Sequence, residues 1–361
     1  MIDIQEKCNG LHFASGQGVD TVVTIERVAQ RAGVSVATVS RTLNNSPAVK
    51  PATAQRVRQA IEALGYVPNQ SARNLRRNES QVILALAPNF SNPYYSRILT
   101  GIGDRAWELE YSVLVCNTLG HANSELRFLK MLESHQADGA ILLGCHWDYG
   151  WLARFAQQSH IVQCCEYVPD LACPSVSIDN YAATREMVAY LQGLGHSRIA
   201  MIGADNQYIS TRLRRQGYLD ILAEAGLEPR AELYRLADAE YSFASGLAAA
   251  QELLAETPRP TAIFCVSDIL ALSAISAAQE LGLDVPGDLT VTGFDDVDYT
   301  TMVHPYLTTV SQPCHEMGRR SVDLLLDGLQ NGKAVPSERT FLPHRLMKRE
   351  SAAPPKFAET I

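Results

Sequence analysis

Short amphipathic segments occupy the chain between residues 24 and 65. In "TIERVAQRAGVSVATVSRTLN", apolar residues recur at helical spacing, and Gly33 followed by Ser35 is typical of one helix ending and another beginning. The sequence "NNSP" ends the second helix early, and a third runs from Pro51 to Gly65. Two short helices joined by a glycine-containing turn predict a helix-turn-helix, which the third helix completes as an all-α headpiece.

The pattern changes at residue 81, where continuous apolar runs begin to alternate with helical stretches. The helical stretches include 123–135, 181–194, 243–255 and 268–282. The apolar runs between them are "VILALAP", "SVLVCNT", "GAILLG", "IVQCC", "RIAMIG", "TAIFCVS" and "LTVTGFD". Strands without polar alternation, placed between helices, indicate parallel sheets covered on both faces. The sequence therefore predicts a large α/β body behind the small helical headpiece.

The composition of the chain indicates how many domains it forms and where in the cell it is located. The chain has 361 residues, 46% of them hydrophobic, which favours two or three cores. No run is long and apolar enough for a membrane helix, and the first residues lack the basic and apolar regions of a secretory signal. Eight scattered cysteines indicate reduced thiols. We therefore expect a cytoplasmic protein without a membrane partner.

Charge is unevenly distributed along the chain. The net charge is −8, yet residues 24–78 hold nine Arg or Lys residues and only two Glu residues. A small basic module on a large acidic body predicts contact with nucleic acid at one end. The alternative is a solvated basic surface with no partner.

The second predicted helix has the chemistry of a DNA-reading helix. Its N-terminal end carries Val36 and Ala37, which are small enough to approach a thymine methyl group, and Arg41 can bind guanine with two hydrogen bonds. Val39 and Leu43 are left to anchor the helix to its neighbours. The alternative is an ordinary helical hairpin, but that interpretation does not explain the exposed hydroxyls and Arg41.

The segment "YVPNQSARNLRRNES" follows the third helix. Residues 70–76 can form one or two helical turns, too few to be stable alone in water. Leu75 lies between Asn74 and Arg76, so an apolar side chain is flanked by polar and basic ones. Such an arrangement suits insertion into the minor groove, whereas composition alone favours a plain linker.

Two other motifs have simpler explanations than the sites they suggest. "GIGDRA" at 101–106 fits a dinucleotide-binding loop loosely, but its glycines fall inside an amphipathic helix. Four cysteines lack metal-ligand spacing, and we expect them to be small buried side chains: Cys145, Cys164, Cys165 and Cys173. We find no catalytic constellation and predict neither a cofactor nor a metal.

The order of "VAQRAGVSVATVSRTLN" and "RVRQAIEALGYVPNQSARNLRR" resembles the headpiece and hinge of the lactose/galactose repressor family, and the resemblance covers residues 24–350. "RNES", "FCVSDILAL" and "GFDDVDYT" are most similar to a nucleoside-responsive member. The resemblance implies a helix-turn-helix headpiece and an α/β effector domain of two periplasmic-binding-protein-like subdomains. One departure is Lys50-Pro51, where the family usually opens the third helix on Ser or Thr.

The resemblance also implies which residues contact double-stranded DNA. Residues matching Val36, Ala37 and Arg41 read bases, and the residue matching Leu75 is a lever in the minor groove, within a hinge that includes Ala72 and Arg73. Other matching residues hold the DNA backbone: Thr24, Ser35, Thr38, Ser40, Asn44, Tyr66 and Asn69.

We expect a ligand cleft between the two subdomains, at the carboxyl ends of their strands. The candidate residues end strands or open the following helices: Tyr94, Tyr95, Glu166, Ser210, Arg214, Tyr241 and Asp295. Carboxylates and an arginine can bind diols, while tyrosines can stack on an apolar ring face. The resemblance strengthens Asp295, Arg214 and Tyr241 most; each residue alone also fits a structural role.

The resemblance divides the chain into five parts. A disordered extension (1–23) is followed by the headpiece (24–69), the hinge (70–80), the effector domain (81–350) and a loose tail (351–361). The extension lies outside the family pattern and can equally reflect a start codon assigned too far upstream. Within the effector domain, the N-subdomain comprises about 81–180 and 309–337, and the C-subdomain about 181–308 and 338–350. The expected crossings lie near 306–311 and 338.

These features together predict a homodimeric transcription regulator that acts as a repressor. Two headpieces are expected on a near-palindromic operator, because one makes too few base contacts. A sugar or nucleoside in the cleft would change how the subdomains close, and hence the hinge. The alternatives are a solute-binding protein without a DNA role and an enzyme on the same α/β scaffold.

The wedge role of Leu75 can be tested by bending. We expect Leu75→Ala to reduce operator bending and sequence preference, because the methyl side chain is too short to unstack a base step. Circularly permuted operator fragments would measure the bend, with Asn74→Ala as the neighbouring control. An unchanged bend angle in Leu75→Ala would reject the wedge.

Overall fold

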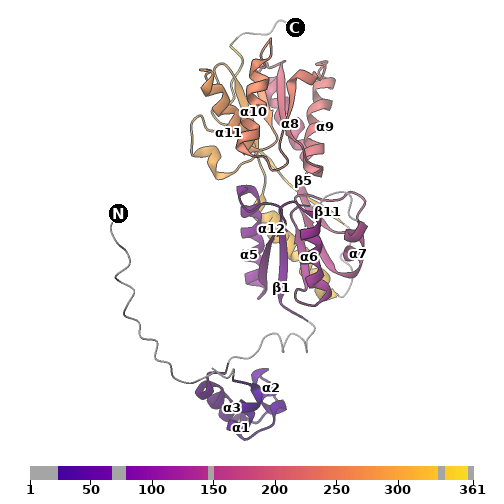
Figure 1. The fold of residues 1–361 in the computed structure, drawn as a ribbon, viewed down its shortest axis with the longest axis vertical. Helices are drawn as coiled ribbons and strands as arrows, with labels where there is room; N and C mark the ends of the chain where they lie inside the picture. Colours follow the sequence, from indigo (N-terminus) through magenta and orange to yellow (C-terminus); the bar gives the residue numbers. More distant parts are fainter. Residues whose placement is uncertain (1–22, 67–78, 145–149, 332–337, 357–361) are drawn as a thin grey trace, which may run out of the picture. The chain divides into compact units, whose positions relative to one another are not determined.

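The computed structural model describes residues 23–66, 79–144, 150–331 and 338–356 (Figure 1). The expectations for the N-terminal extension and for most of the hinge, including Asn69, Ala72, Arg73 and Leu75, lie outside these residues. The chain forms two compact units. The first, Met1–Arg77, contains the headpiece, and the second, Asn78–Ile361, is here called the body.

The headpiece contains three helices, as the sequence predicts: α1 (Ile25–Ala32), α2 (Val36–Leu43) and α3 (Pro51–Leu64). Gly33 ends α1 with a left-handed φ of 63°, and the Ser35 side chain caps α2 by accepting from the Thr38 amide. Lys50 precedes α3 without a side-chain cap, which agrees with the departure seen in the sequence. Val28, Val39 and Val57 are fully buried at the centre of the three helices.

The body contains two six-stranded sheets covered by helices, with strand orders β11-β5-β4-β3-β1-β2 and β12-β10-β9-β8-β6-β7 (Figure 1). The first sheet and its helices form the N-subdomain, and the second sheet and its helices form the C-subdomain. All strand pairs are parallel except β10–β12. The strands of the first sheet are β1 (Val82–Ala87), β2 (Ser112–Asn117), β3 (Gly139–Leu142), β4 (His160–Cys164), β5 (Ser175–Ile178) and β11 (Arg339–Leu342). Those of the second are β6 (Ile199–Ala204), β7 (Tyr234–Ala237), β8 (Ala262–Cys265), β9 (Thr290–Asp295), β10 (Thr308–Ser311) and β12 (Arg345–Met347).

Helices connect the strands in the order expected for parallel sheets. Those of the N-subdomain are α5 (Pro93–Glu108), α6 (Ala122–Glu133), α7 (Gly150–Gln158) and α12 (Cys314–Asn331). Those of the C-subdomain are α8 (Asn180–Gly193), α9 (Ile209–Glu224), α10 (Phe243–Ala255) and α11 (Asp268–Glu280), with two short 3₁₀ turns, η1 (Ala231–Leu233) and η2 (Asp298–Thr301). The central strands are buried along their length, as in β3 of the first sheet and β9 of the second, so both sheets are covered on both faces.

The two later chain crossings differ from the sequence-based expectation. Strand β10 belongs to the second sheet, so the chain returns to the N-subdomain only after Ser311. Strand β11 then completes the first sheet, so the final crossing follows Leu342 rather than residue 338. The expected positions follow from the family resemblance; the apolar pattern marks neither strand, because β10 is rich in threonine and β11 alternates between exposed and half-buried residues. The first crossing lies between β5 of the first sheet and α8, which precedes β6 of the second.

Both glycines of "GIGDRA" lie inside α5, and Gly101 allows α5 to pack closely against α12. A Cβ atom at Gly101 would lie 2.0 Å from the His315 carbonyl oxygen, and one at Gly318 would lie 2.3 Å from the Ile98 carbonyl oxygen. Helices α5 and α12 therefore approach backbone to backbone. No helix in the described parts of the chain is both long and apolar enough to cross a membrane.

This contact predicts a strong effect of one added methyl group. Gly318→Ala should destabilise the body by about 1–3 kcal/mol, because the new Cβ atom meets backbone that cannot rotate away. Urea unfolding would measure the change. Gly103→Ala is the control, since a Cβ atom there meets nothing within 4 Å. Equal stability of the two variants would contradict the close packing.

Candidate nucleic-acid interface and effector cleft

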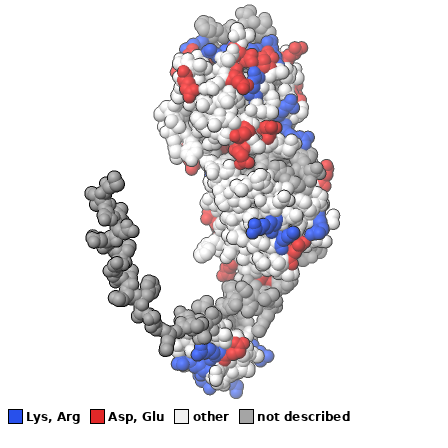
Figure 2. All heavy atoms as spheres, in the orientation of Figure 1, with Lys and Arg blue, Asp and Glu red and all other residues white. Residues whose placement is uncertain are grey.

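The headpiece exposes the predicted base-reading side of α2. Val39 is fully buried, whereas Ala37 and Arg41 are exposed and Val36 is half-buried. The exposed positions follow from the helix itself, because Val39 faces the other two helices and the residues two positions on either side face away from them. Side chains of Lys and Arg gather on the headpiece (Figure 2), in keeping with its basic sequence.

Several residues expected to contact the DNA backbone lie around the same helix. Thr24, Ser35 and Asn44 are exposed, and Thr38 shares a hydroxyl contact of 3.0 Å with Ser35. Tyr66 packs partly against the headpiece core. The headpiece thus presents small side chains, hydroxyls and one arginine around the start and outer face of α2, the composition that a major-groove reader requires.

In the body, a buried polar cluster at the boundary between the subdomains is built around Arg214 of α9. Its side chain is 6% exposed; it donates to the Asn180 side chain at 2.9 Å and to the Val266 carbonyl at 2.5 Å. The guanidinium carbon lies 3.6 Å from the centre of the Phe294 ring. These contacts hold the guanidinium plane in one orientation, at the carboxyl ends of β8 and β9.

Asp295 lies beside this guanidinium, with an oxygen 3.8 Å from an Arg214 nitrogen. The same oxygen accepts a 2.7 Å hydrogen bond from Gln312, whose carbonyl oxygen accepts from the Tyr94 hydroxyl at 3.2 Å. Burial raises the pKa of Asp295 to about 7, although the charge on Arg214 opposes that shift. A polar chain therefore runs from the C-subdomain to Tyr94 in the N-subdomain.

Glu166 and Ser210 form a second link across the cleft. Glu166 follows β4 in the N-subdomain and accepts hydrogen bonds from both the amide (3.1 Å) and the hydroxyl of Ser210, at the start of α9. Burial raises the pKa of Glu166 to about 7, while the bonds from Ser210 lower it. Burial thus favours the protonated form of both Glu166 and Asp295 relative to a carboxyl group in water, and in that form each can donate as well as accept a hydrogen bond.

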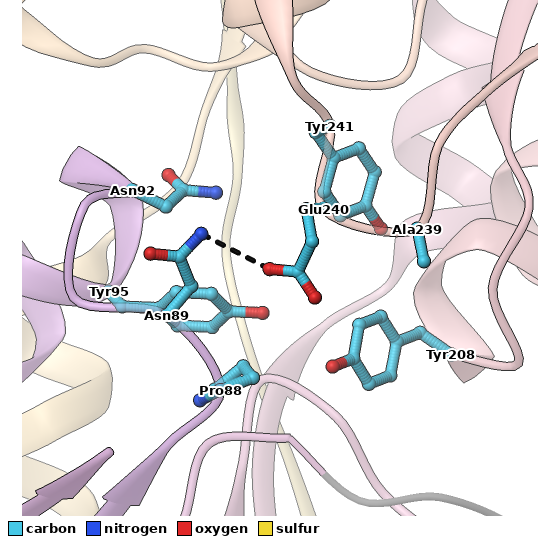
Figure 3. Close-up of a pocket in the computed structure, with 8 residues that line it drawn as sticks. All are labelled: Pro88, Asn89, Asn92, Tyr95, Tyr208, Ala239, Glu240 and Tyr241. Atoms are coloured by element: carbon cyan, nitrogen blue, oxygen red, sulfur yellow. Dashed lines mark hydrogen bonds between the residues drawn. The ribbon is translucent and has the colours of Figure 1, made fainter. Parts of the chain in front are cut away.

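Tyrosines line the small cavity beside this polar cluster (Figure 3). Tyr95 reaches it from α5, Tyr241 from the loop before α10, and Tyr208 from the residue before α9. Tyr241 exchanges a 2.9 Å hydrogen bond with Thr211. The Asn89 amide donates to Glu240 at 3.1 Å across the subdomain boundary. The cavity measures about 10 Å³, room for about one water molecule, so a sugar or nucleoside requires the subdomains to separate.

The structure brings all seven predicted effector residues to the facing sides of the two subdomains. Tyr94, Arg214 and Asp295 share one polar chain, and Glu166 and Ser210 share another. Tyr95 and Tyr241 line the cavity instead. Four further residues escaped sequence reasoning: Asn89, Tyr208, Glu240 and Gln312. Short polar side chains in loops carry no periodic signal, although each lies within a few residues of the carboxyl end of a strand.

The cysteines named from the sequence are structural. Cys164, Cys165 and Cys173 are buried, and the thiols of Cys165 and Cys173 donate to the carbonyls of Leu143 and Ile161. Cys145 lies outside the described residues. These thiols pack as small apolar side chains, which is the role expected for them.

A helix-turn-helix headpiece joined to a two-subdomain cleft defines a class of protein: a DNA-binding regulator controlled by a small molecule. Known families agree. Residues 24–69 match the model described as bacterial regulatory proteins, lacI family, and residues 188–352 match a periplasmic binding protein-like domain.

Named relatives extend over almost the whole chain. The transcriptional repressor CytR of Escherichia coli K12 is 37% identical over 335 residues, which are 92% of this chain and 97% of the repressor. Catabolite control protein A of Priestia megaterium is 36% identical over 91% of this chain and 99% of its own. The chain therefore belongs to the lacI family of bacterial regulatory proteins, whose named relatives are transcriptional repressors rather than enzymes.

Solved structures show the same arrangement. The lac repressor dimer bound to operator and the anti-inducer ONPF has a TM-score of 0.82 and 30% identity, covering 92% of this chain and 99% of that one. The complex of the regulator CelR with cellobiose has a TM-score of 0.70 and 31% identity, covering 91% of this chain and 100% of that one. As a member of this family, the protein is a DNA-binding transcription regulator with an effector-binding domain.

The exposed arginine of α2 predicts a base-specific effect. Arg41→Ala should weaken operator binding by roughly 1–3 kcal/mol and relax base preference, because a bidentate contact to guanine is lost. Titration of operator and of random-sequence DNA at one salt concentration would measure both effects. Arg56→Ala, which removes an exposed cation from α3, is the matched control. An equal loss on both DNAs for Arg41→Ala would argue against base reading.

Proposed function

We propose that the protein is a cytoplasmic repressor whose homodimer places two headpieces on a near-palindromic operator and whose cleft binds a small sugar or nucleoside. The observation that carries the effector assignment is the buried chain of Arg214, Asp295, Gln312 and Tyr94. It supplies a fixed double donor, a carboxyl group and an amide at one end of the cleft. Vicinal hydroxyls, as on a sugar or ribose ring, are the groups that match this set.

The raised pKa values of two buried carboxyl groups support a hydroxyl-rich ligand. The pKa of both Glu166 and Asp295 is about 7 because burial disfavours the carboxylate form. A hydroxyl group donates and accepts hydrogen bonds, so it can pair with either form of such a carboxyl group. A fully ionised site would instead favour a cation. Tyr95, Tyr208 and Tyr241 offer ring faces for the apolar side of the same ligand.

The hydrogen bonds between the subdomains explain how a bound ligand can change DNA binding. Glu166 with Ser210 and Asn89 with Glu240 join the two subdomains directly. A ligand bound between the subdomains must replace or reinforce these links, so it binds the open and closed forms with different affinities. Only that difference in affinity can change operator binding. The CelR structure, which contains cellobiose, supports a glycoside-type ligand, and the lac repressor structure supports dimeric operator binding.

A solute-binding protein without a DNA role is the runner-up. The exposed reading face of α2 disfavours it, since a solute-binding protein has no use for such a surface. Operator binding that weakens steeply with rising salt would separate the two functions.

The central effector residue can be tested directly. Asp295→Ala should abolish the effector response and leave operator binding intact, because Asp295 belongs to the cleft. Operator binding would be titrated with a panel of hexoses, disaccharides and ribonucleosides. Asp298→Ala, exposed three residues further on, is the control. A normal response by Asp295→Ala to a compound that also acts on the parent protein would overturn the assignment.

A further inference from the structure

The place where the chain enters the body is held by one carboxylate. Asp138, immediately before β3, accepts hydrogen bonds from the Ser80 amide at 2.6 Å, the Ser80 hydroxyl at 2.8 Å and the Gln81 amide at 2.8 Å. Ser80 is 8% exposed. Both oxygens of a single side chain thus bind the backbone just before β1, a few residues after the segment that joins the headpiece to the body.

Further bonds fix the same residues from both neighbouring strands. The Gln81 carbonyl accepts from the Ser112 amide at 2.9 Å, and the Val82 carbonyl accepts from the Asp138 amide at 2.9 Å. Gln81 has a left-handed φ of 55°, which a residue with a Cβ atom adopts reluctantly. Such a conformation persists only where the surroundings over-determine it. The chain is therefore held in a sharp, disfavoured turn as it enters β1.

The anchored end is connected to the cleft by two paired strands. Strands β1 and β3 run in parallel, with Ile83 opposite Gly139 and Leu86 opposite Leu142. At the far end of β1, Pro88 and Asn89 line the cavity between the subdomains. Since both strands are buried and hydrogen-bonded, displacement at the cleft end moves the anchored end with it.

We propose that Asp138 is a positioning residue for operator binding: it fixes the direction in which the chain leaves each body, and thereby the spacing between the two headpieces of a dimer. The inference rests on operator binding by a dimer. A carboxylate needed only for stability would leave that spacing unchanged when it is removed. Spacing is therefore the measurement that separates a positioning role from a merely structural one.

The experiment selects bound duplexes from a random-sequence DNA pool with the full-length protein and reads the spacing between the enriched half-sites. Asp138→Ala removes the carboxylate. Gln81→Gly keeps the carboxylate but widens the range of backbone angles open to residue 81, while the left-handed φ of 55° is unstrained for glycine. The matched control is Asp288→Ala in the C-subdomain, where the carboxylate also accepts from a backbone amide, that of Asp284 at 2.9 Å.

The parent protein and Asp288→Ala are expected to enrich one spacing. Asp138→Ala and Gln81→Gly should accept neighbouring spacings as well, and Asp138→Ala should bind the parent operator roughly 10-fold more weakly. If the parent enriches no motif, operator recognition and this inference fail together. The other outcome is that the parent enriches a motif with one spacing, and that Gln81→Gly and Asp138→Ala, if it folds, keep this spacing. In that case only the inference fails.

Discussion

The guanidinium of Arg214 carries a positive charge into a part of the body with almost no access to water. Burial of an unpaired charge is costly, so its surroundings must supply hydrogen bonds and negative charge. They do so from separate elements: Asn180 opens α8, Val266 follows β8, and Phe294 and Asp295 end β9. One side chain thereby ties three strand or helix ends together and fixes the polar cluster at the boundary between the subdomains.

The same constraint determines the chemistry of the neighbouring carboxyl groups. Burial raises the pKa of Asp295 although Arg214 stands beside it. Burial also raises the pKa of Glu166, against the hydrogen bonds from Ser210 and the charge of Arg214. Arg214 and Asp295 form one ion pair, and the contacts that link Glu166 to Ser210 and Asn89 to Glu240 are hydrogen bonds. The two subdomains are thus joined by a few exchangeable polar contacts, which is what a ligand-controlled hinge requires.

Local chemistry explains what the sequence could predict. The headpiece helices begin and end where expected because Gly33, Ser35 and Pro51 act on their immediate neighbours. Residues at strand ends could be found for the cleft because the carboxyl ends of parallel strands converge. Asn89 and Glu240 could not be paired, since 151 positions separate them in the chain. Strand β10 could not be recognised in the sequence either. Its buried Thr309 donates a hydrogen bond to Asp268, so a polar residue lies where an apolar one was expected.

The order of the last strands affects how the body can fold while the protein is being synthesised. Strand β11 forms one edge of the first sheet and β12 one edge of the second, and they are only a few residues apart near the end of the described chain. While the protein emerges from the ribosome, the N-subdomain lacks both α12 and β11 long after its first five strands have been made. Those strands keep an unpaired edge at β5 until β11 has been translated, which happens only after β6 to β10 of the second sheet. The interleaved chain thus postpones completion of either half, and a nascent regulator can complete both subdomains only after β11 and β12 have been made.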